Sequence, residues 1–324
     1  MILEDLQYVY IRVQGLIWVT NGLVESTNIR IGVGNEIDRI YNEVSTKIPL
    51  IIDFRNIESI ADHTLDTLMI NIEKNKRPVI LINTNSVESS IVPNLPTKIT
   101  SERFSDKDSR SLNIALNGSF NTKDFSVIVI GMMQKKIQSI VKASFSPFES
   151  KKHLASTPIL ANGIYDANKI IFDRESFFWV CLAMNDILKE VIATRFGAPI
   201  KLLSVSLRSA PFASVLSQFN KIPLETIDHL GPRHKVFDLD ILPNLIDKKK
   251  FSYIYVGDFC FGGTEIKIAK TYAQFAQSTF ESAIVIGTLL PQDTFADDFD
   301  LRAVLGLGAL GADSGAEFKF IESK

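Results

Sequence analysis

Cysteine is scarce in this chain, which has two cysteines, Cys181 and Cys260, among 324 residues. Two cysteines cannot supply a disulfide framework, and such low usage is typical of proteins that fold in a reducing compartment. The first residues include early acids and no positive region followed by an apolar one, which argues against a signal peptide. The sequence therefore predicts a cytoplasmic protein.

Long apolar runs and an excess of one charge are also missing. No stretch approaches the roughly 18 consecutive apolar residues that a helix needs to cross a bilayer. Lys and Arg together number 35 against 37 Asp and Glu, and neither half of the chain is basic. A broad electrostatic surface for nucleic acid is therefore not expected. We predict neither a membrane nor a nucleic acid as a partner.

What the chain does have is the length and composition of a two-domain globular protein. Apolar residues make up 46% and charged residues 22%, which is ordinary for a folded soluble chain. A length of 324 residues exceeds what one hydrophobic core usually serves. Residues 144–158 show no apolar periodicity, so we place the boundary there. The predicted domains are 1–150 and 151–324.

The first half alternates patterns typical of strands and helices, which predicts a small layered α/β structure. Residues 84–124 are rich in polar residues and proline, and are expected to be irregular. Ser59 and Asp62 have the spacing of a helix capping box. The expected elements are two short strands joined by a turn in 7–20, a helix at 35–46, a strand at 50–52, a helix after Asp62, a strand at 79–82, a strand at 125–131 and then a helix with Ile137, Ile140 and Val141 inward.

One segment of this half carries a family resemblance. The strand Pro49–Phe54, followed by Ile57–Ile60 and a helix, resembles a STAS-type module over residues 7–85. STAS domains occur in sulfate transporters and anti-sigma-factor antagonists, which implies a module that binds a protein partner. Thr64 is the hydroxyl residue that this chain offers at the start of the helix. The alternative is an α/β lobe that merely packs against the second half.

The second half predicts a parallel sheet, because strands and helices alternate along it and parallel strands need helical crossovers. Cys181 falls on a broad apolar helix face and is expected in the core. Ser176 is the expected N-cap of that helix. The expected elements are a helix at 176–195, a strand at 200–207, a helix from Phe212, a strand at 222–228, a strand at 251–256, a helix at 264–277 and a strand at 282–288.

The strand 251–256 leads to the residues most indicative of function. Asp258 follows it, and then Gly262, Gly263 and Thr264 open the next helix. Glycines let main-chain N–H groups approach an anion, and Thr is a good N-cap for a helix whose N-terminus attracts phosphate. Asp258 is placed to accept hydrogen bonds from sugar hydroxyls. The alternative is an ordinary strand-to-helix turn.

This stretch resembles the phosphoribosyl-pyrophosphate loop of type I phosphoribosyltransferases, in which two adjacent acids precede Thr-Gly-Gly-Thr. Here Gly257 stands in place of the first acid, the loop is one residue shorter, and Phe259 and Phe261 make it more apolar. The resemblance extends over about 160–290. It implies a doubly wound parallel sheet and a ligand-binding edge at the carboxyl ends of its strands.

The resemblance also assigns roles to individual residues. Gly262, Gly263 and Thr264 would bind the 5-phosphate of 5-phosphoribosyl-1-pyrophosphate (PRPP), and Asp258 would hold ribose hydroxyls and Mg²⁺. Arg208 and Ser209 match the loop that binds the diphosphate, whereas Arg233 and Lys235 match the flexible loop that closes over the reaction centre. Members of the family commonly form homodimers.

Two functions of different classes follow from this resemblance. In the first, the protein transfers phosphoribosyl from PRPP to a nitrogen acceptor, with Asp258, Arg233 and Lys235 as the catalytic residues. In the second, it binds a phosphoribosyl or nucleotide ligand without turnover, as a sensor whose first half contacts a protein partner. The missing acid at Gly257 and the shortened loop argue against full transferase activity, because losing one charge-assisted hydrogen bond costs about 1.5–3 kcal/mol.

Overall fold

The structure is a computed structural model that divides into two compact units, Met1–Lys136 and Ile137–Lys324. The boundary expected near residue 150 stays a prediction. The described residues are 2–4, 7–13, 15–19, 22–26, 28–29, 48–98, 100–105, 112–118, 125–154, 157–194, 198–227, 250–295, 298–308, 310 and 315–320. The helix expected at 35–46 lies outside them.

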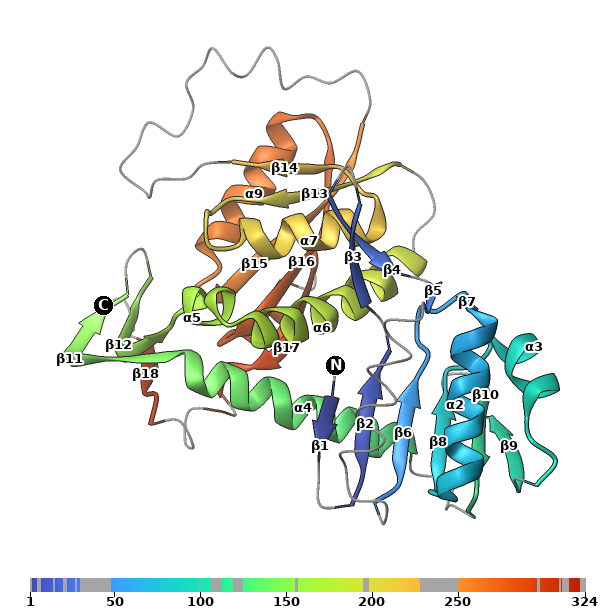
Figure 1. The fold of residues 1–324 in the computed structure, drawn as a ribbon. Helices are drawn as coiled ribbons and strands as arrows, with labels where there is room; N and C mark the ends of the chain where they lie inside the picture. The colour runs from blue at the N-terminus through green and yellow to red at the C-terminus, as the bar shows by residue number, and fades with distance from the viewer. Residues whose placement is uncertain are drawn as a thin grey trace. The chain divides into compact units, whose positions relative to one another are not determined.

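The first unit contains a six-stranded mixed sheet (Figure 1). Its central strands β2, β6 and β8 are parallel, whereas β1, β10 and β9 run antiparallel to their neighbours. In sheet order the strands are β1 (Ile2–Glu4), β2 (Val9–Arg12), β6 (Leu50–Asp53), β8 (Val79–Ile82), β10 (Leu112–Leu116) and β9 (Ser101–Ser105). The strands expected at 50–52 and 79–82 are confirmed, and a STAS-type fold stays a prediction.

The helix expected after Asp62 is α2 (Asp62–Asn75), whose apolar residues at helical spacing are buried against this sheet. Its N-cap is Ala61 and no side chain caps it, so the predicted capping box is wrong. Residues 84–124 are more regular than expected, since they include β9 and β10. The short helices α3 (Glu88–Ile91) and η1 (Val92–Asn94) also fall there.

Of two further expectations for the first half, one is confirmed and one is wrong. The two short strands expected in 7–20 are present as β2 and β3 (Gly15–Val19), and β3 pairs with β4 (Gly22–Ser26). The segment expected as a strand at 125–131 opens the helix α4 (Phe125–Ser144). Val127 and Ile130 are 67% and 52% exposed while Val129 is buried. This one-sided burial fits a helix, because a strand in the middle of a sheet buries both faces.

The second unit is built on a five-stranded sheet in which every neighbouring pair is parallel. The expected strands are confirmed, although β15 extends four residues further than the sequence indicated and β17 was missed. In sheet order they are β14 (Leu224–Thr226), β13 (Ile200–Ser204), β15 (Ser252–Cys260), β16 (Thr279–Thr288) and β17 (Asp300–Gly306). All nine residues of β15 are buried, as expected for a central strand.

Helices cover both faces of this sheet (Figure 1). Helix α9 (Thr264–Phe275) packs on the face that carries Tyr253 and Tyr255. Because side chains alternate along a strand, the buried Ile254 and Val256 face the other side, where α6 (Arg174–Ala193) and α7 (Ala210–Asn220) contact the strands. The doubly wound arrangement expected for this half is therefore present.

Around α6, the predicted N-cap is wrong and the predicted burial of Cys181 is confirmed. Its N-cap is Asp173, whose carboxylate accepts a hydrogen bond from the main-chain N–H of Ser176, so the predicted cap lies three residues too late. Cys181 is buried in the core, as expected, and both cysteines carry free thiols. A shorter helix, α5 (Ala167–Phe172), precedes α6.

A small antiparallel sheet completes the second unit. It contains β11 (Phe145–His153), β12 (Ile159–Tyr165) and β18 (Phe318–Phe320), with β12 in the middle. Residues 144–158 were expected to be irregular, but β11 fills much of this range. Its side chains are exposed or half-buried throughout, and it therefore shows no clear alternation of apolar and polar residues.

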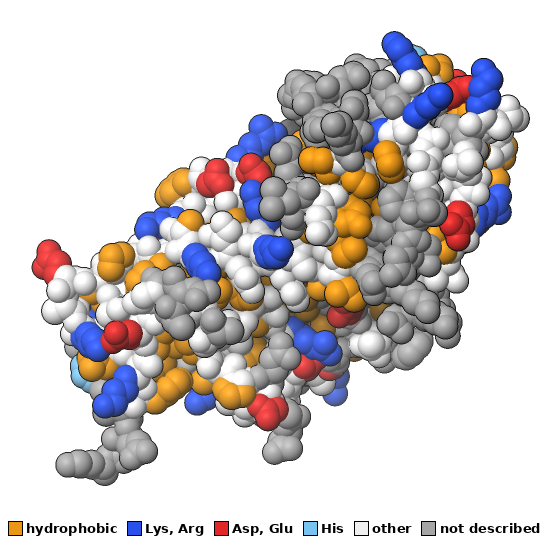
Figure 2. Space-filling view, turned by 90° about the horizontal axis from the view of Figure 1, so that it is seen from below, with side chains coloured by type: hydrophobic (Ala, Val, Ile, Leu, Met, Phe, Trp, Pro, Cys, Tyr) orange, Lys and Arg blue, Asp and Glu red, His pale blue; other side chains and the backbone are white. Residues whose placement is uncertain are grey.

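In the ranges given above, no helix is long and apolar enough to cross a membrane. On the face drawn in Figure 2, Lys and Arg side chains lie interspersed with Asp and Glu side chains. This mixture matches the near-balanced charge of the sequence.

Candidate functional site

The predicted ligand residues come from the carboxyl ends of two neighbouring strands of the second unit. Strands β13 and β15 are parallel partners, so the segments that follow them leave the sheet at the same edge. Arg208 follows β13, and Gly262 follows β15. Burial raises the pKa of both Asp258 and Glu265, and the charge of Arg208 partly offsets each rise, so the guanidinium acts on both carboxyls. We call this edge the rim.

Asp258 lies inside β15, whereas the sequence placed it between the strand and the turn. Only 9% of it is exposed, and its carboxylate accepts hydrogen bonds from its own main-chain N–H and that of Phe259. Burial, followed by the nearby charge of Glu265, raises its pKa from 3.8 to about 7. At neutral pH the carboxyl is therefore close to half protonated.

Glu265 is a member of this site that sequence reasoning missed. It lies in the first turn of α9, and the Tyr255 hydroxyl donates a hydrogen bond of 2.9 Å to its Oε2 atom. Burial raises its pKa, while hydrogen bonds from Tyr255 and Ser206 and the charge of Arg208 act in the opposite direction. Its position directly after Gly-Gly-Thr was the available signal, because an acid is favoured at a helix N-terminus.

The two glycines of the turn serve different purposes. Gly263 has a φ of 74°, a left-handed conformation that suits glycine, and it is the N-cap of α9. Thr264 is the first helical residue, so the N-cap predicted at Thr264 is wrong. A Cβ atom added at Gly262 would lie 2.7 Å from the methyl group of Thr157. Gly262 is thus required by close packing.

The main chain at Gly263 is already engaged. Gly263 is buried, and its N–H group hydrogen-bonds to the thiol of Cys260. Burial raises the pKa of that thiol to about 11. In this structure the turn therefore directs one of its N–H groups inward, while Gly262 and Thr264 are half-buried.

Gly257 stands where the family resemblance calls for an acid, and the structure explains the glycine. A Cβ atom at this position would lie 2.6 Å from the ring and hydroxyl of Tyr255. Tyr255 is buried, and its hydroxyl is held by Glu265. The space that an acid at position 257 would need is thus filled by the tyrosine ring.

The segment after β13 is organised by three serines. The Oγ atoms of Ser204 and Ser209 lie 2.7 Å apart, and those of Ser206 and Ser209 lie 2.9 Å apart. Ser209 is fully buried at the N-cap of α7, so its hydroxyl holds the loop in shape. Arg208 is exposed on the same loop. Of the two residues predicted for the diphosphate, Arg208 is the one that is accessible to a ligand.

Two of the predicted catalytic residues cannot be placed. Arg233 and Lys235 lie outside the described residues, as does the segment 228–249 that contains them. Among the residues described, no group of three or more His, Cys, Asp or Glu side chains could hold a metal ion. Asp258, Glu265 and Arg208 are the charged residues of the described rim that act on one another electrostatically.

A cavity of about 520 Å³ lies where β16 and β17 end at the rim side of the sheet. Leu289 and Leu307 line it from the sheet, and Leu160 and Phe318 line it from the antiparallel strands. Phe261, from the turn after β15, also packs on Phe318, with 5.5 Å between the ring centroids. Charged residues, Lys151, Glu317 and Lys319, also line this cavity, so it is a mixed apolar and charged space on the same side as the rim.

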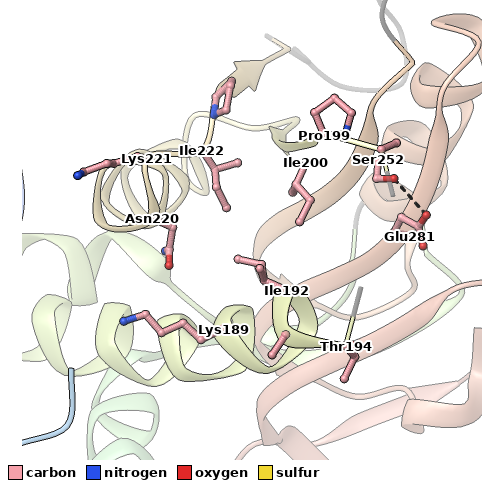
Figure 3. Close-up of a pocket in the computed structure, with 13 residues that line it drawn as sticks. Lys189, Ile192, Thr194, Pro199, Ile200, Asn220, Lys221, Ile222, Ser252 and Glu281 are labelled. Atoms are coloured by element: carbon pink, nitrogen blue, oxygen red, sulfur yellow. Dashed lines mark hydrogen bonds between the residues drawn. The ribbon is translucent and has the colours of Figure 1, made fainter. Parts of the chain in front are cut away.

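A larger cavity, of about 810 Å³, lies at the opposite edge, beside the first residues of β13 and β15 (Figure 3). Its isoleucines lie between Lys189 and Lys221 on one side and the hydrogen-bonded Ser252 and Glu281 on the other. The ammonium groups of both lysines point away from the isoleucines. Ligands of open parallel sheets bind at the carboxyl ends of strands, which favours the rim.

No protein-family model and no curated protein matches the chain. Solved structures similar to it include orotate phosphoribosyltransferase from Aeropyrum pernix (15% identity, 57% of this chain and 98% of that chain, TM-score 0.42). Leishmania donovani UMP synthase is a further example (14% identity, 56% of this chain and 38% of that chain, TM-score 0.40). Another is adenine phosphoribosyltransferase from Thermoanaerobacter pseudethanolicus (12% identity, 53% of this chain and 98% of that chain, TM-score 0.38). Because these TM-scores lie below 0.5, the function proposed below rests on the chain's own residues.

Proposed function

We propose that the second unit is a phosphoribosyltransferase-like domain that binds a phosphoribosyl or nucleotide ligand at the rim. The observation that carries this proposal is the gathering of Asp258, Glu265 and Arg208, from separate segments, at the carboxyl edge of a parallel sheet. Asp258 has a strongly raised pKa there. Buried ionisable groups that perturb one another in this way are typical of functional sites.

Each part of the rim suits one part of such a ligand. The first turn of α9, with Gly262 and Thr264 beside it, would receive the 5-phosphate, because a helix N-terminus attracts anions. Asp258 would accept hydrogen bonds from the ribose hydroxyls. The cavity lined by Leu289 and Phe318 offers space for a base.

Magnesium belongs to this proposal as the ion that accompanies a phosphorylated ligand. Mg²⁺ in such sites is commonly held by one or two carboxylates together with ligand phosphates. Asp258 and Glu265 would supply those carboxylates. Bound Mg²⁺ would neutralise charge on the phosphates.

Binding without turnover is favoured over transfer by the surroundings of Asp258 and Gly257. Transfer would require the bond from C1 to the diphosphate to break as a nitrogen acceptor bonds to C1 and pyrophosphate leaves. The chain has one acid instead of two at the sugar, and that acid is buried and close to half protonated at neutral pH. Transfer to a nitrogen acceptor is the second candidate function, since Arg208 remains accessible on its loop.

The two candidates are separated by measuring binding and pyrophosphate release on the same protein. Isothermal titration of ribose 5-phosphate or PRPP with Mg²⁺ is expected to give saturable binding that Asp258→Asn weakens by about tenfold. The matched control is Asp293→Asn, an exposed aspartate in the same unit, which should leave binding unchanged. Absence of binding to both ligands would refute the proposed function.

Pyrophosphate release with a panel of nitrogenous bases then decides between binding and transfer. We expect no release above the level without protein. Release that depends on Asp258 would establish the transferase instead. The first unit as a partner-binding module, the homodimer and the cytoplasmic location stay predictions.

A further inference from the structure

The larger cavity of the second unit lies away from the rim and suits a different kind of ligand. It has a volume of about 810 Å³ and lies at the edge where β13 and β15 begin (Figure 3). The ends of α6 and α7 and the strands β13, β15 and β16 supply its walls. Cavities that hold small molecules usually measure about 300–1,000 Å³. This space is therefore large enough for a ligand of its own.

The middle of this cavity is apolar. Ile192, Ile200 and Ile222 come from three separate segments, and all three are half-buried. Pro199 and Pro223 are exposed beside them. These side chains line one concave surface instead of packing into the core (Figure 3). Covering apolar surface removes it from water, which is favourable, so the cavity suits a ligand with an apolar body.

The sheet side of the cavity offers a carboxylate. Ser252 is buried, and its hydroxyl donates a hydrogen bond of 3.3 Å to the Oε1 atom of Glu281. This bond fixes the carboxylate beside the first residue of β15. A carboxylate has about four acceptor sites on its two oxygens, so it can accept a further hydrogen bond from a ligand. The sheet side therefore suits a protonated amine.

The helix side of the cavity carries positive charge. Lys189 from α6 and Lys221 at the C-cap of α7 line it, with their ammonium groups directed away from the isoleucines (Figure 3). The Nδ2 group of Asn220 donates a hydrogen bond of 2.7 Å to Oδ1 of the buried Asn185, which joins the end of α7 to α6. Asn185 precedes Lys189 by one helical turn, and Asn220 precedes Lys221. The two lysines are thus held on one side, which suits an acidic group.

We propose that this cavity binds a small molecule with an apolar body, an amine at one end and an acid at the other. The amine lies against Glu281, the acid lies against Lys189 and Lys221, and the isoleucines surround the body between them. The placement of opposite charges on opposite sides of an apolar space carries this proposal. It is independent of the proposed function, because the cavity and the rim lie at opposite edges of the sheet.

The test compares three probes that share one alkyl chain. They are 8-aminooctanoate with both end groups, octanoate with the acid alone and octylamine with the amine alone. The flexible chain lets the end groups adjust to the separation of their partners. Each probe is titrated calorimetrically into the full-length protein at about pH 7, up to about 10 mM. Wild type should bind 8-aminooctanoate at least about tenfold more tightly than either of the others, because a charge-assisted contact is lost with each end group.

Two variants each remove the charge of one side. Glu281→Gln should reduce the advantage of 8-aminooctanoate over octanoate to about threefold or less and keep its advantage over octylamine. The double variant Lys189→Gln/Lys221→Gln should do the reverse. The matched controls Glu190→Gln and Lys267→Gln remove exposed charges in the same unit and should change neither ratio.

The ratios are taken within each protein, so a variant that is merely less stable does not imitate the effect. Should Glu281→Gln fail to fold, the lysine variant and the three probes on wild type still decide. Binding of octanoate or octylamine by wild type as tightly as 8-aminooctanoate would overturn the proposal. Ratios that the variants leave unchanged, or no binding of any probe, would overturn it too. The proposed function at the rim would stand in each case.

Discussion

Replacing Asp258 with asparagine should stabilise the second unit at alkaline pH. Burial, and then the charge of Glu265, raise the pKa of Asp258 from 3.8 to about 7. One pKa unit corresponds to about 1.4 kcal/mol, so keeping this carboxylate ionised in the folded state costs up to about 4 kcal/mol. Asparagine avoids that cost but weakens the acceptor for the N–H of Phe259, at about 1–2 kcal/mol. The expected net gain is about 2 kcal/mol at about pH 8.

The sign of the pH dependence follows from proton uptake. Below pH 3.8 the carboxyl is protonated in both folded and unfolded chains, and its full contribution to stability is present. Between about pH 4 and pH 7 the unfolded chain releases this proton while the folded protein keeps it, so the free energy of unfolding falls as pH rises. Above about pH 8 both states are ionised and the loss is complete.

Urea unfolding of the full-length protein at about pH 5.5 and about pH 8 measures this effect. Trp179 is buried in the second unit, so its fluorescence reports that unit when Trp18 is replaced with phenylalanine in all variants. Wild type should lose stability between the two pH values, and Asp258→Asn should lose much less. The exposed control Asp293→Asn should follow wild type. Parallel pH profiles for wild type and Asp258→Asn would refute the reasoning.

Three further outcomes are expected. Gly257→Ala should lower the free energy of unfolding by about 1–3 kcal/mol, because its Cβ would meet the Tyr255 ring, and a smaller loss in urea unfolding would contradict the packing described. Gly131 lies in helix α4 with open space around it, so Gly131→Ala should raise the free energy of unfolding by about 0.5–1 kcal/mol in the same assay. Cys181 and Cys260 should resist a thiol-titrating reagent in the native protein and react once it is unfolded, since both are buried with raised pKa values.

The sheet of the second unit was predictable because its signals are local. The apolar run in β15 and the periodic faces of α6 and α9 each indicate an element without information from elsewhere in the chain. Their alternation then requires parallel strands. Strand β17 escaped prediction because it carries charged and half-buried residues, which dilute the apolar pattern of an edge strand.

Helix α4 shows where local reasoning fails. Its run of β-branched residues from Val127 to Ile130 favours a strand by intrinsic preference. The helix nevertheless buries Met132, Ile137 and Val141 on one side, and that spacing extends over more residues than the β-branched run. Tertiary burial thus overrides the preference of a short segment.

The candidate site was predicted in part, because some of its residues can be identified from local sequence and others depend on tertiary contacts. Asp258, Arg208 and the glycines were identified from their order along the chain, which places them at one edge. The packing of the Tyr255 ring over Gly257 could not be identified in this way, because it depends on which face of β15 each side chain occupies. Nor could the hydrogen bond from Tyr255 to Glu265, which joins residues on two different elements.

These contacts connect residues that look unrelated along the sequence. Gly257 lacks a side chain, which lets the Tyr255 ring lie across it, and the ring carries the hydroxyl that holds Glu265. An acid at position 257 would therefore displace the Tyr255 ring and take its hydroxyl away from Glu265. Gly257, Tyr255 and Glu265 thus form one packed arrangement, in which each residue depends on the next.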